Sequence, residues 1–220
     1  MALIDNIRSY YKLDDTADSH GANTLTNNGS VSFATAGKIG NSAGTFNTGS
    51  QRLDVANAMG FTSTSTNTYN FWVKFNAVSG YLFDTFTTSG ASKRHLLYGS
   101  TDRINTYINV TDASISTGAA SITTGVWYML TLTHSSGAYE LFLNSVSKGT
   151  ATPGGTSGLS NLFAIGNASD SYTVPINGQI DEYGVWDRVL TGAEITSLYN
   201  GGVGLQYPFA SSTSALLMFM

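Results

Sequence analysis

The sequence has no cysteine and little of several other residue types, and each shortage excludes something. Without Cys there are no disulfides, thiolate zinc sites or Cys nucleophiles. Only 11% of the 220 residues are charged, and Lys93-Arg94 is the one adjacent basic pair. Binding to nucleic acid needs clustered cations, so the sequence argues against a nucleic-acid partner. No run approaches the ~20 apolar residues of a membrane span.

The start of the chain, Met-Ala-Leu-Ile-Asp-Asn-Ile-Arg, has no basic stretch followed by an apolar one. A secretory signal peptide is therefore not predicted. Low charge together with abundant Ser and Thr is typical of extracellular binding modules and virion proteins. We therefore expect a virion or extracellular location that is reached without a signal peptide.

The composition favours strands and turns. Three Glu and three Pro stand against 27 Ser, 28 Thr and 24 Gly. Thr, Tyr, Phe and Val suit strands, while Gly and Asn suit turns. Short apolar or alternating segments recur along the chain, among them 70–75, 81–86, 126–134 and 139–143. The pattern predicts an all-β protein, a sandwich of two antiparallel sheets rather than a set of βαβ units.

One segment, 191–201, departs from the strand pattern. It opens with a Thr that is followed three residues later by Glu, continues with apolar residues at helical spacing and ends in Asn-Gly. This capping box with a left-handed stop predicts one short C-terminal helix. A chain of this length commonly forms one β domain. We expect a single domain over 1–204, followed by a separate tail, 205–220.

The last third of the chain resembles a known family. Residues 177–188 read Asn-Gly-Gln-Ile-Asp-Glu-Tyr-Gly-Val-Trp-Asp-Arg, and Glu-Ile and Leu-Tyr-Asn-Gly follow by residue 201. This run is similar to the closing signature of laminin-G-like, concanavalin-A-like jelly-roll domains. Earlier segments match other elements of the family in the same order, namely 11–21, 37–46, 71–74 and 125–128. The resemblance implies a two-sheet jelly roll over about residues 8–204.

The chain departs from the family pattern in two places. Asn144-Ser145 stands where relatives carry Asp-Gly in a hairpin turn. Since Asn tolerates positive φ, we expect this turn to be kept. His20 stands in the opening loop where a small residue is usual.

The resemblance implies a scaffold with varied ligands rather than one activity. We predict a non-catalytic adhesion or carbohydrate-binding module, a phage or viral virion component such as a fibre, tail or capsid-decoration protein. Its partners would be a glycan or cell-surface receptor, other virion proteins or copies of itself. The alternative is a purely structural assembly protein without a glycan ligand. A glycoside hydrolase is less favoured.

Hydrolysis by a retaining glycosidase needs two carboxylates ~5 Å apart. The sequence contains no Glu-x-Asp-x-x-Glu motif, and its Glu residues are Glu140, Glu182 and Glu194. Asp181 and Glu182 are neighbours on an expected strand, which directs their side chains to opposite faces. None of the histidines lies in a nucleophile motif, and we expect all three on the surface or in loops: His20, His95 and His134.

One loop is rich in oxygen ligands of the kind that calcium prefers, with Asp14, Asp15, Asp18 and Asn23 close in sequence. The resemblance places Asp181 near this loop, and relatives often hold Ca²⁺ between such a loop and this aspartate. Asp18, Asn23 and Asp181 are therefore candidate ligands of a structural calcium ion. In the alternative, Asp18 and Asn23 make turn hydrogen bonds and Asp181 accepts backbone N–H groups.

Aromatic and apolar residues supply the remaining candidates. Four tyrosines are candidate outward rings that stack on sugars, with an ordinary surface or partly buried position as the alternative: Tyr107, Tyr139, Tyr172 and Tyr207. The uncharged end of the tail, 215–220, would expose an apolar run in water. Leu216, Leu217 and Phe219 are therefore candidate assembly contacts. Residues 207–209 either belong to this tail or fold back on the sandwich.

Overall fold

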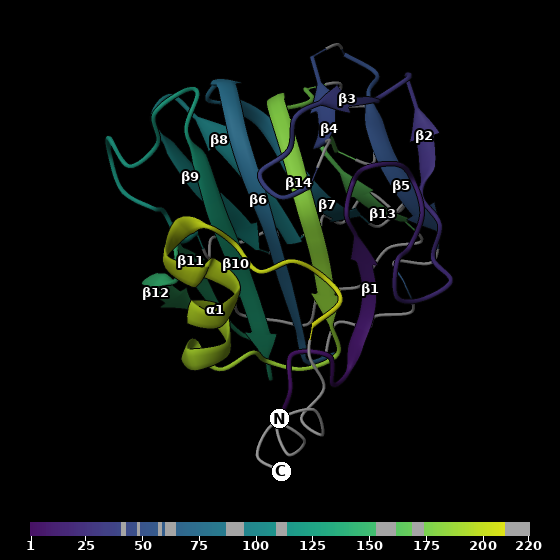
Figure 1. Ribbon diagram of the computed structural model, residues 1–220. Helices are drawn as coiled ribbons and strands as arrows, with labels where there is room; N and C mark the ends of the chain where they lie inside the picture. Colours follow the sequence, from purple (N-terminus) through teal and green to yellow (C-terminus); the bar gives the residue numbers. More distant parts are fainter. Residues whose placement is uncertain are drawn as a thin grey trace.

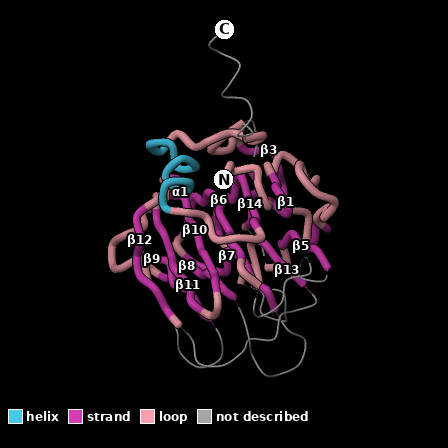
Figure 2. Tube along the Cα trace, turned by 90° about the horizontal axis from the view of Figure 1, so that it is seen from below, coloured by secondary structure: helices cyan, strands magenta, loops and turns pink. Residues whose placement is uncertain are grey.

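The computed structural model describes residues 1–40, 43–47, 49–56, 59, 65–86, 95–108, 114–152, 162–168 and 174–209. Two antiparallel sheets face each other, and one short helix lies against the outside of the larger sheet (Figures 1 and 2). The prediction of an all-β sandwich with a single C-terminal helix is confirmed. No helix in the described part of the chain has the length and apolar character to cross a membrane.

Sheet A has eight strands in the order β12-β11-β10-β6-β14-β4-β3, and β1 pairs with the remaining part of β14. Sheet B has six, in the order β2-β5-β13-β7-β8-β9. The strands are β1 (Ile7–Tyr11), β2 (Thr26–Asn28), β3 (Ser32–Thr35), β4 (Ala43–Phe46), β5 (Arg52–Ala56), β6 (Asn67–Ala77), β7 (Ser79–Phe86), β8 (His95–Ser100), β9 (Arg103–Ile108), β10 (Trp127–Ser135), β11 (Ala138–Leu143), β12 (Val146–Ala151), β13 (Leu162–Ile165) and β14 (Asn177–Trp186).

An aromatic core fills the space between the sheets. The ring of Phe71 on β6 stacks on Tyr183 of β14, with centroids 4.8 Å apart. Tyr69 of sheet A reaches Phe83 of sheet B at 4.9 Å. All four side chains are fully buried. Each contributes about 1.5–3 kcal/mol by leaving water, so this layer of rings joins the two sheets.

Two tight hairpins join neighbouring strands of sheet A, and one of them is the turn expected at Asn144-Ser145. Ser136 and Gly137 join β10 to β11 with φ of 50° and 84°. Asn144 and Ser145 join β11 to β12 with φ of 51° and 66°. Positive φ at both central residues gives the turn whose twist matches that of the flanking strands. The Asn-Ser departure from the family pattern therefore leaves the hairpin intact.

A second apolar cluster covers the outside of sheet A. The helix α1 (Gly192–Tyr199) places Ile195 and Leu198 in one cluster with Trp72 and Met129, which point out of the sheet. Its N-terminus has the predicted capping box, and Asn200 ends it in the left-handed conformation with φ 47°. The helix thus forms because its ends are capped, and it is held because it buries the outer face of the sheet.

The chain beyond the helix covers more of the same face. The ring of Tyr207 stacks on Tyr10 with centroids 4.5 Å apart, and Phe209 lies edge-on to Tyr10 and parallel to Trp186. Tyr207 and Phe209 are 8% and 6% exposed. Of the two alternatives for 207–209, folding back on the sandwich is the one observed. The candidate assembly residues Leu216, Leu217 and Phe219 lie outside the described residues.

Candidate functional site

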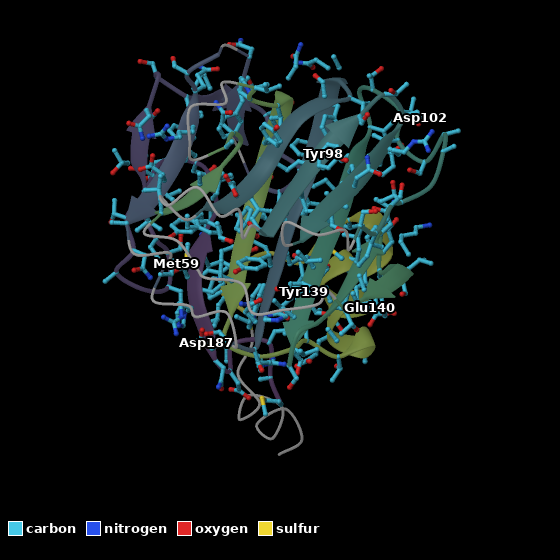
Figure 3. The ribbon with its side chains drawn as sticks, turned by 180° about the vertical axis from the view of Figure 1, so that it is seen from behind. Met59, Tyr98, Asp102, Tyr139, Glu140 and Asp187 are labelled. Carbon is cyan, nitrogen blue, oxygen red and sulfur yellow. The ribbon has the colours of Figure 1, made fainter. Side chains whose placement is uncertain are left out.

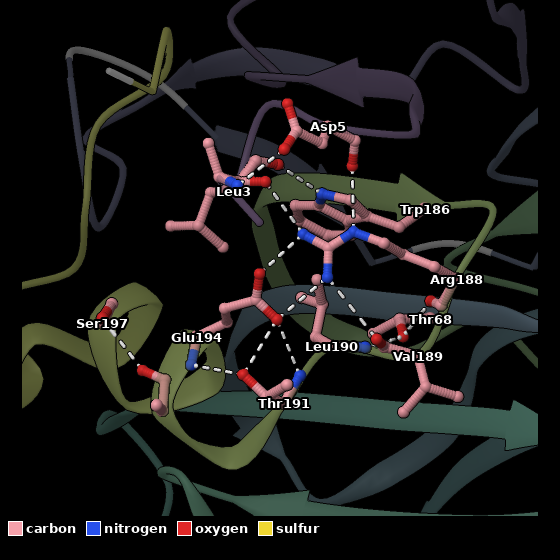
Figure 4. A network of polar contacts seen from close by, with 12 residues as sticks. Leu3, Asp5, Thr68, Trp186, Arg188, Val189, Leu190, Thr191, Glu194 and Ser197 are labelled. Carbon is pink, nitrogen blue, oxygen red and sulfur yellow. Dashed lines mark hydrogen bonds and ion pairs between the residues drawn. The ribbon is translucent and has the colours of Figure 1, made fainter. Parts of the chain in front are cut away.

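The segment that carries the family resemblance forms a clamp between the helix and the N-terminus (Figure 4). Arg188 donates from Nη1 and Nη2 to the two carboxylate oxygens of Glu194, at 2.9 and 2.7 Å, and also to the carbonyls of Ala2 and Asp5. Partial burial raises the pKa of Glu194, but hydrogen bonds from Arg188 and Thr191 outweigh it and hold the pKa at about 2. This part of the signature is structural.

A β-bulge in β14 turns two carboxyl groups to the same face. Glu182 has φ 51°, and the pairing with β6 shifts between Asp181 and Gly184. Asp181 and Glu182 both lie on the outer face, between Ile180 and Tyr183, which belong to the inner core. The prediction that they point to opposite faces is wrong, because the extra residue of the bulge breaks the alternation.

Both carboxyl groups are buried and fasten other segments to β14. Glu182 Oε2 accepts the Tyr10 hydroxyl at 2.5 Å, and burial raises the pKa of Glu182 to about 8. Asp181 Oδ2 accepts the N–H groups of Lys38 and Ile39 at 2.7 and 2.9 Å. Burial raises the pKa of Asp181 to about 7, and its Oδ1 has no hydrogen-bond partner among the described residues. The pair therefore ties β1 and the loop 36–40 to β14.

Asp18, a candidate calcium ligand, organises its own loop. Its Oδ1 accepts the backbone N–H groups of Tyr10, His20 and Gly21 at 3.0, 3.0 and 2.9 Å, and its Oδ2 accepts that of Asn23 at 3.1 Å. Burial raises the pKa of Asp18, but these four bonds outweigh it and lower the pKa. Each oxygen of the carboxylate is thus already bound by the loop.

The other two candidate ligands are also engaged within the protein. Asn23 donates from its side-chain amide to Ser9 Oγ, while Asp181 binds the loop 36–40. Among the described residues, no three His, Asp or Glu side chains form a group that could hold a metal ion. The contacts of Asp18, Asn23 and Asp181 are those of the hydrogen-bonding alternative. Calcium binding stays a prediction.

One of the three histidines, His134, differs from the expected surface or loop position. His134 on β10 is 1% exposed and stacks on Tyr139 with ring centroids 4.2 Å apart. A surface position is thus wrong for His134, because strand alternation directs it inward. His20 does lie in a loop, with Nδ1 2.8 Å from the Tyr207 hydroxyl. His95 begins β8, and its side chain lies outside the described residues.

None of the four candidate sugar-stacking tyrosines has a described, open ring. Tyr139 faces the inner core and is 2% exposed, and Tyr207 lies against Tyr10. The side chains of Tyr107 and Tyr172 lie outside the described residues. The prediction of an outward ring is therefore wrong for Tyr139 and Tyr207.

Two other tyrosines lie half-buried on the outer face of sheet B. Tyr81 of β7 and Tyr98 of β8 are cross-strand partners, with ring centroids 6.4 Å apart and planes inclined by 64°. Tyr98 also pairs with Asn105 of β9. Since Leu97 and Ile104 point into the core, their neighbours Tyr98 and Asn105 point outward. Figure 3 shows Tyr98 on this side of the molecule.

The neighbouring row of the same sheet adds polar groups. Ser100 of β8 pairs with Ser79 of β7 and with Arg103 of β9. The guanidinium of Arg103 is bound by Asp102, Nε to Oδ1 at 2.9 Å, which neutralises its charge. Aromatic rings beside amide and hydroxyl groups can take the apolar face and the hydroxyls of a sugar.

The sequence did not reveal this site. The segment 81–86 has the apolar content of a core strand, and strict alternation would place Tyr81 on the same face as Phe83. A register shift between Tyr81 and Phe83 turns Tyr81 outward instead. The only sequence signal was that Tyr98 follows two leucines, so alternation directs it away from Leu97.

These features define a lectin-like antiparallel sandwich with one face closed by a helix and the other carrying half-buried rings. Residues 43–196, well over half of the chain, match the model of the concanavalin A-like lectin/glucanases superfamily. The chain belongs to this family, and the laminin-G-like and concanavalin-A-like resemblance is confirmed. No curated protein matches the sequence significantly.

Solved structures with the same fold include a domain of an arabinanase and the binding domains of two neurotoxins. Domain 4 of AbnA, an extracellular arabinanase from Geobacillus stearothermophilus, was solved with arabinotriose; it is 22% identical, with 91% of this chain and 98% of that chain covered and a TM-score of 0.68. The binding domain of botulinum neurotoxin serotype D is 14% identical, with coverage of 90% and 52% and a TM-score of 0.64. The binding domain of botulinum neurotoxin DC, solved with rat synaptotagmin II, is 14% identical, with coverage of 94% and 53% and a TM-score of 0.68. The chain spans about half of each toxin domain.

Proposed function

We propose that the chain is a non-catalytic carbohydrate-binding module whose sugar site is the outer face of sheet B around Tyr98. The observation that carries the proposal is the cross-strand pair of Tyr81 and Tyr98, half-buried and flanked by Asn105. A sugar ring would stack on Tyr98, and the Asn105 amide would offer both donors and an acceptor to adjacent hydroxyls.

The similar structures support this class of function. One neighbour holds arabinotriose, and another is a toxin whose cell entry depends on two ganglioside molecules. Both molecules carry a saccharide, and both proteins share this sandwich. Because the identities are low, these neighbours support binding of a saccharide and leave its composition to experiment.

The positions of the glutamates support a role without catalysis. Glu182 is bound to Tyr10, Glu194 is bound to Arg188, and Glu140 accepts the Ser147 hydroxyl at 2.5 Å on an exposed part of sheet A. Each of the three carboxylates thus binds a different partner, in sheet A or in the segments that cover it. A glycosidase would need two of them on either side of one bond.

Titration calorimetry tests the sugar site, with arabinotriose as the first probe and a glycan array for the wider search. We expect a bound saccharide whose affinity falls about tenfold in Tyr98→Ala, since the stacking surface is lost. Tyr98→Phe keeps the ring and should stay within about twofold. Melting curves of the three proteins control for folding. An affinity unchanged in Tyr98→Ala, or an array without any bound glycan, would overturn the proposal.

A second candidate function is assembly, as a virion component such as a fibre, tail or capsid-decoration protein of phage or viral origin, in a virion or extracellular location. The observation that favours it is the anchoring of Tyr207 and Phe209 on Tyr10 and Trp186. Residues 211–220 follow this anchor directly, and their apolar side chains would contact a neighbouring copy or another virion protein.

Deletion of 211–220 tests the assembly role. We expect loss of self-association or particle attachment, measured by sedimentation, while the melting temperature stays unchanged because the anchor at 207–209 is kept. A truncated protein that assembles normally would contradict this role.

A further inference from the structure

Six of the eight Lys and Arg side chains of the described residues fall into two groups. Four arginines each form an ion pair with a carboxylate: Arg8, Arg52, Arg103 and Arg188. Two lysines have no carboxylate partner within the described ranges and lie over tryptophan rings instead. Lys38 Nζ is 4.8 Å from the ring centroid of Trp72, and Lys74 Nζ is 5.0 Å from that of Trp127. These two charges are therefore positioned without being neutralised.

The four side chains are neighbours on the outer face of sheet A. Trp72 and Lys74 are two residues apart on β6, so they share a face with Cα atoms about 7 Å apart. Trp127 of β10 is the cross-strand partner of Lys74. Lys38 is held in place by its backbone, whose N–H binds the buried carboxylate of Asp181 at 2.7 Å. We call this set, Lys38, Trp72, Lys74 and Trp127, the lysine–tryptophan corner.

The lysine–tryptophan corner lies at the edge of the part of sheet A that the helix covers, so most of it stays partly exposed. Trp72 is 3% exposed, under Tyr199 of the helix, but Trp127 and both lysines are half-buried. An interaction of an ammonium with an aromatic face contributes about 0.5–1 kcal/mol at an exposed site. It orders the lysine side chains in advance and leaves their charge available to an anion.

Two polar side chains that could bind a saccharide lie next to the corner, on β6 and on the neighbouring strand β14. Asn76 follows Lys74 by two residues on β6, is exposed, and donates from Nδ2 to Asn177 Oδ1 of β14 at 3.3 Å. The two side chains form an exposed amide pair next to the cations. Amides accept and donate to hydroxyl groups, as a sugar ring requires.

We infer that the lysine–tryptophan corner is a second binding site and that it takes an acidic saccharide. The sugar's carboxylate would bind the ammonium groups of Lys38 and Lys74, its hydroxyls the amides of Asn76 and Asn177, and its ring the edge of Trp127. In a protein of net charge −4, two unpaired cations on one face favour an anionic ligand here over elsewhere. The inference goes beyond the site at Tyr98, which is on the opposite sheet and offers no unpaired cation among its described residues.

Calorimetry with trigalacturonate, and with galactotriose as its neutral counterpart, tests the inference on the full chain. We expect trigalacturonate to bind and galactotriose to bind much more weakly. Lys74→Met and Lys38→Met keep the apolar stem and should each weaken the acidic ligand about fivefold, the size of one partly exposed ion pair. High salt should weaken it further. Lys148→Met on β12 changes the net charge equally and should stay within about twofold.

The variant Tyr98→Ala distinguishes binding at the lysine–tryptophan corner from binding at the site around Tyr98. Tyr98→Ala should leave trigalacturonate binding unchanged, whereas a loss in that variant would place the acidic sugar on sheet B. Failure of trigalacturonate to bind the wild-type chain, or equal weakening by Lys148→Met, would overturn the inference. Circular dichroism melting of each variant shows that a lost affinity does not come from unfolding.

Discussion

The outer faces of both sheets carry aromatic rings, but the two faces differ in how far other segments of the chain cover those rings. On sheet A, Tyr10, Trp72 and Trp186 are at most 3% exposed, because α1, the N-terminal segment and residues 205–209 cover them. On sheet B, Tyr81 and Tyr98 stay half-buried beside Asn105. Outward rings are structural where described segments cover them, whereas the partly exposed rings of sheet B can contact a partner.

This difference between the two faces also explains why the family resemblance predicts the fold but not the ligand. Its signature residues build the closed face: Arg188 clamps Glu194, and Asp181 and Glu182 fasten a loop and β1. Tyr81 and Tyr98 lie outside that signature. A chain can therefore keep the closed face of the family and change the open one, which is where ligands would differ.

The largest expected effect is on the closed face. Arg188→Ala should lower the free energy of unfolding by about 3 kcal/mol, because Glu194 would remain partly buried without its hydrogen-bonded partner. Denaturant unfolding measures this change. Arg103→Ala, which removes a solvent-exposed ion pair from the open face, should lower the free energy of unfolding far less. Equal losses in the two variants would show that the closed face is not the more strongly held one.

The second-largest expected effect is on the stability at acidic pH, and it depends on Glu194. Glu194 has a pKa of about 2 in the folded chain, against 4.5 as its ordinary value. A depressed pKa means that the clamp contributes its full stability above pH 4.5 and loses it as the pH falls toward 2. We expect Glu194→Gln to be less stable at neutral pH and to have a flatter acid limb, measured by melting temperature against pH. A parallel acid limb in wild type and variant would contradict this assignment.

Local patterns in the sequence were sufficient for much of the fold. The helix at 192–199 was predictable because its capping box and apolar spacing lie within one segment, and the turn at Asn144-Ser145 because Asn accepts positive φ. The bulge at Glu182 was not predictable, because one extra residue in a strand leaves no mark on composition. It moved Glu182 to the face of Asp181 and so changed the chemistry expected there.

The candidate site was less predictable because it depends on contacts between distant segments. Tyr207 was expected to be a possible open ring, and it is covered because it stacks on Tyr10, almost the whole chain away. His134 was expected at the surface, and strand pairing with Tyr139 places it in the core. Packing between distant segments decides which face of a sheet becomes covered. The sequence of a single segment therefore does not predict which face that is.

The smallest expected effect concerns calcium on the closed face. Asp18 already accepts four backbone N–H groups, and Asp181 Oδ2 accepts two. A chelator should therefore leave the melting temperature unchanged, since only a ligand bound to the native state would raise it. Asp181→Asn should cost about 1 kcal/mol with or without the chelator, because it weakens the attachment of Lys38 and Ile39. A melting temperature that falls on chelation in the wild type, but not in Asp181→Asn, would instead support the calcium site. In that case Oδ1 of Asp181, which no described residue contacts by a hydrogen bond, would face the ion, and the bound ion would contribute to the stability of the closed face.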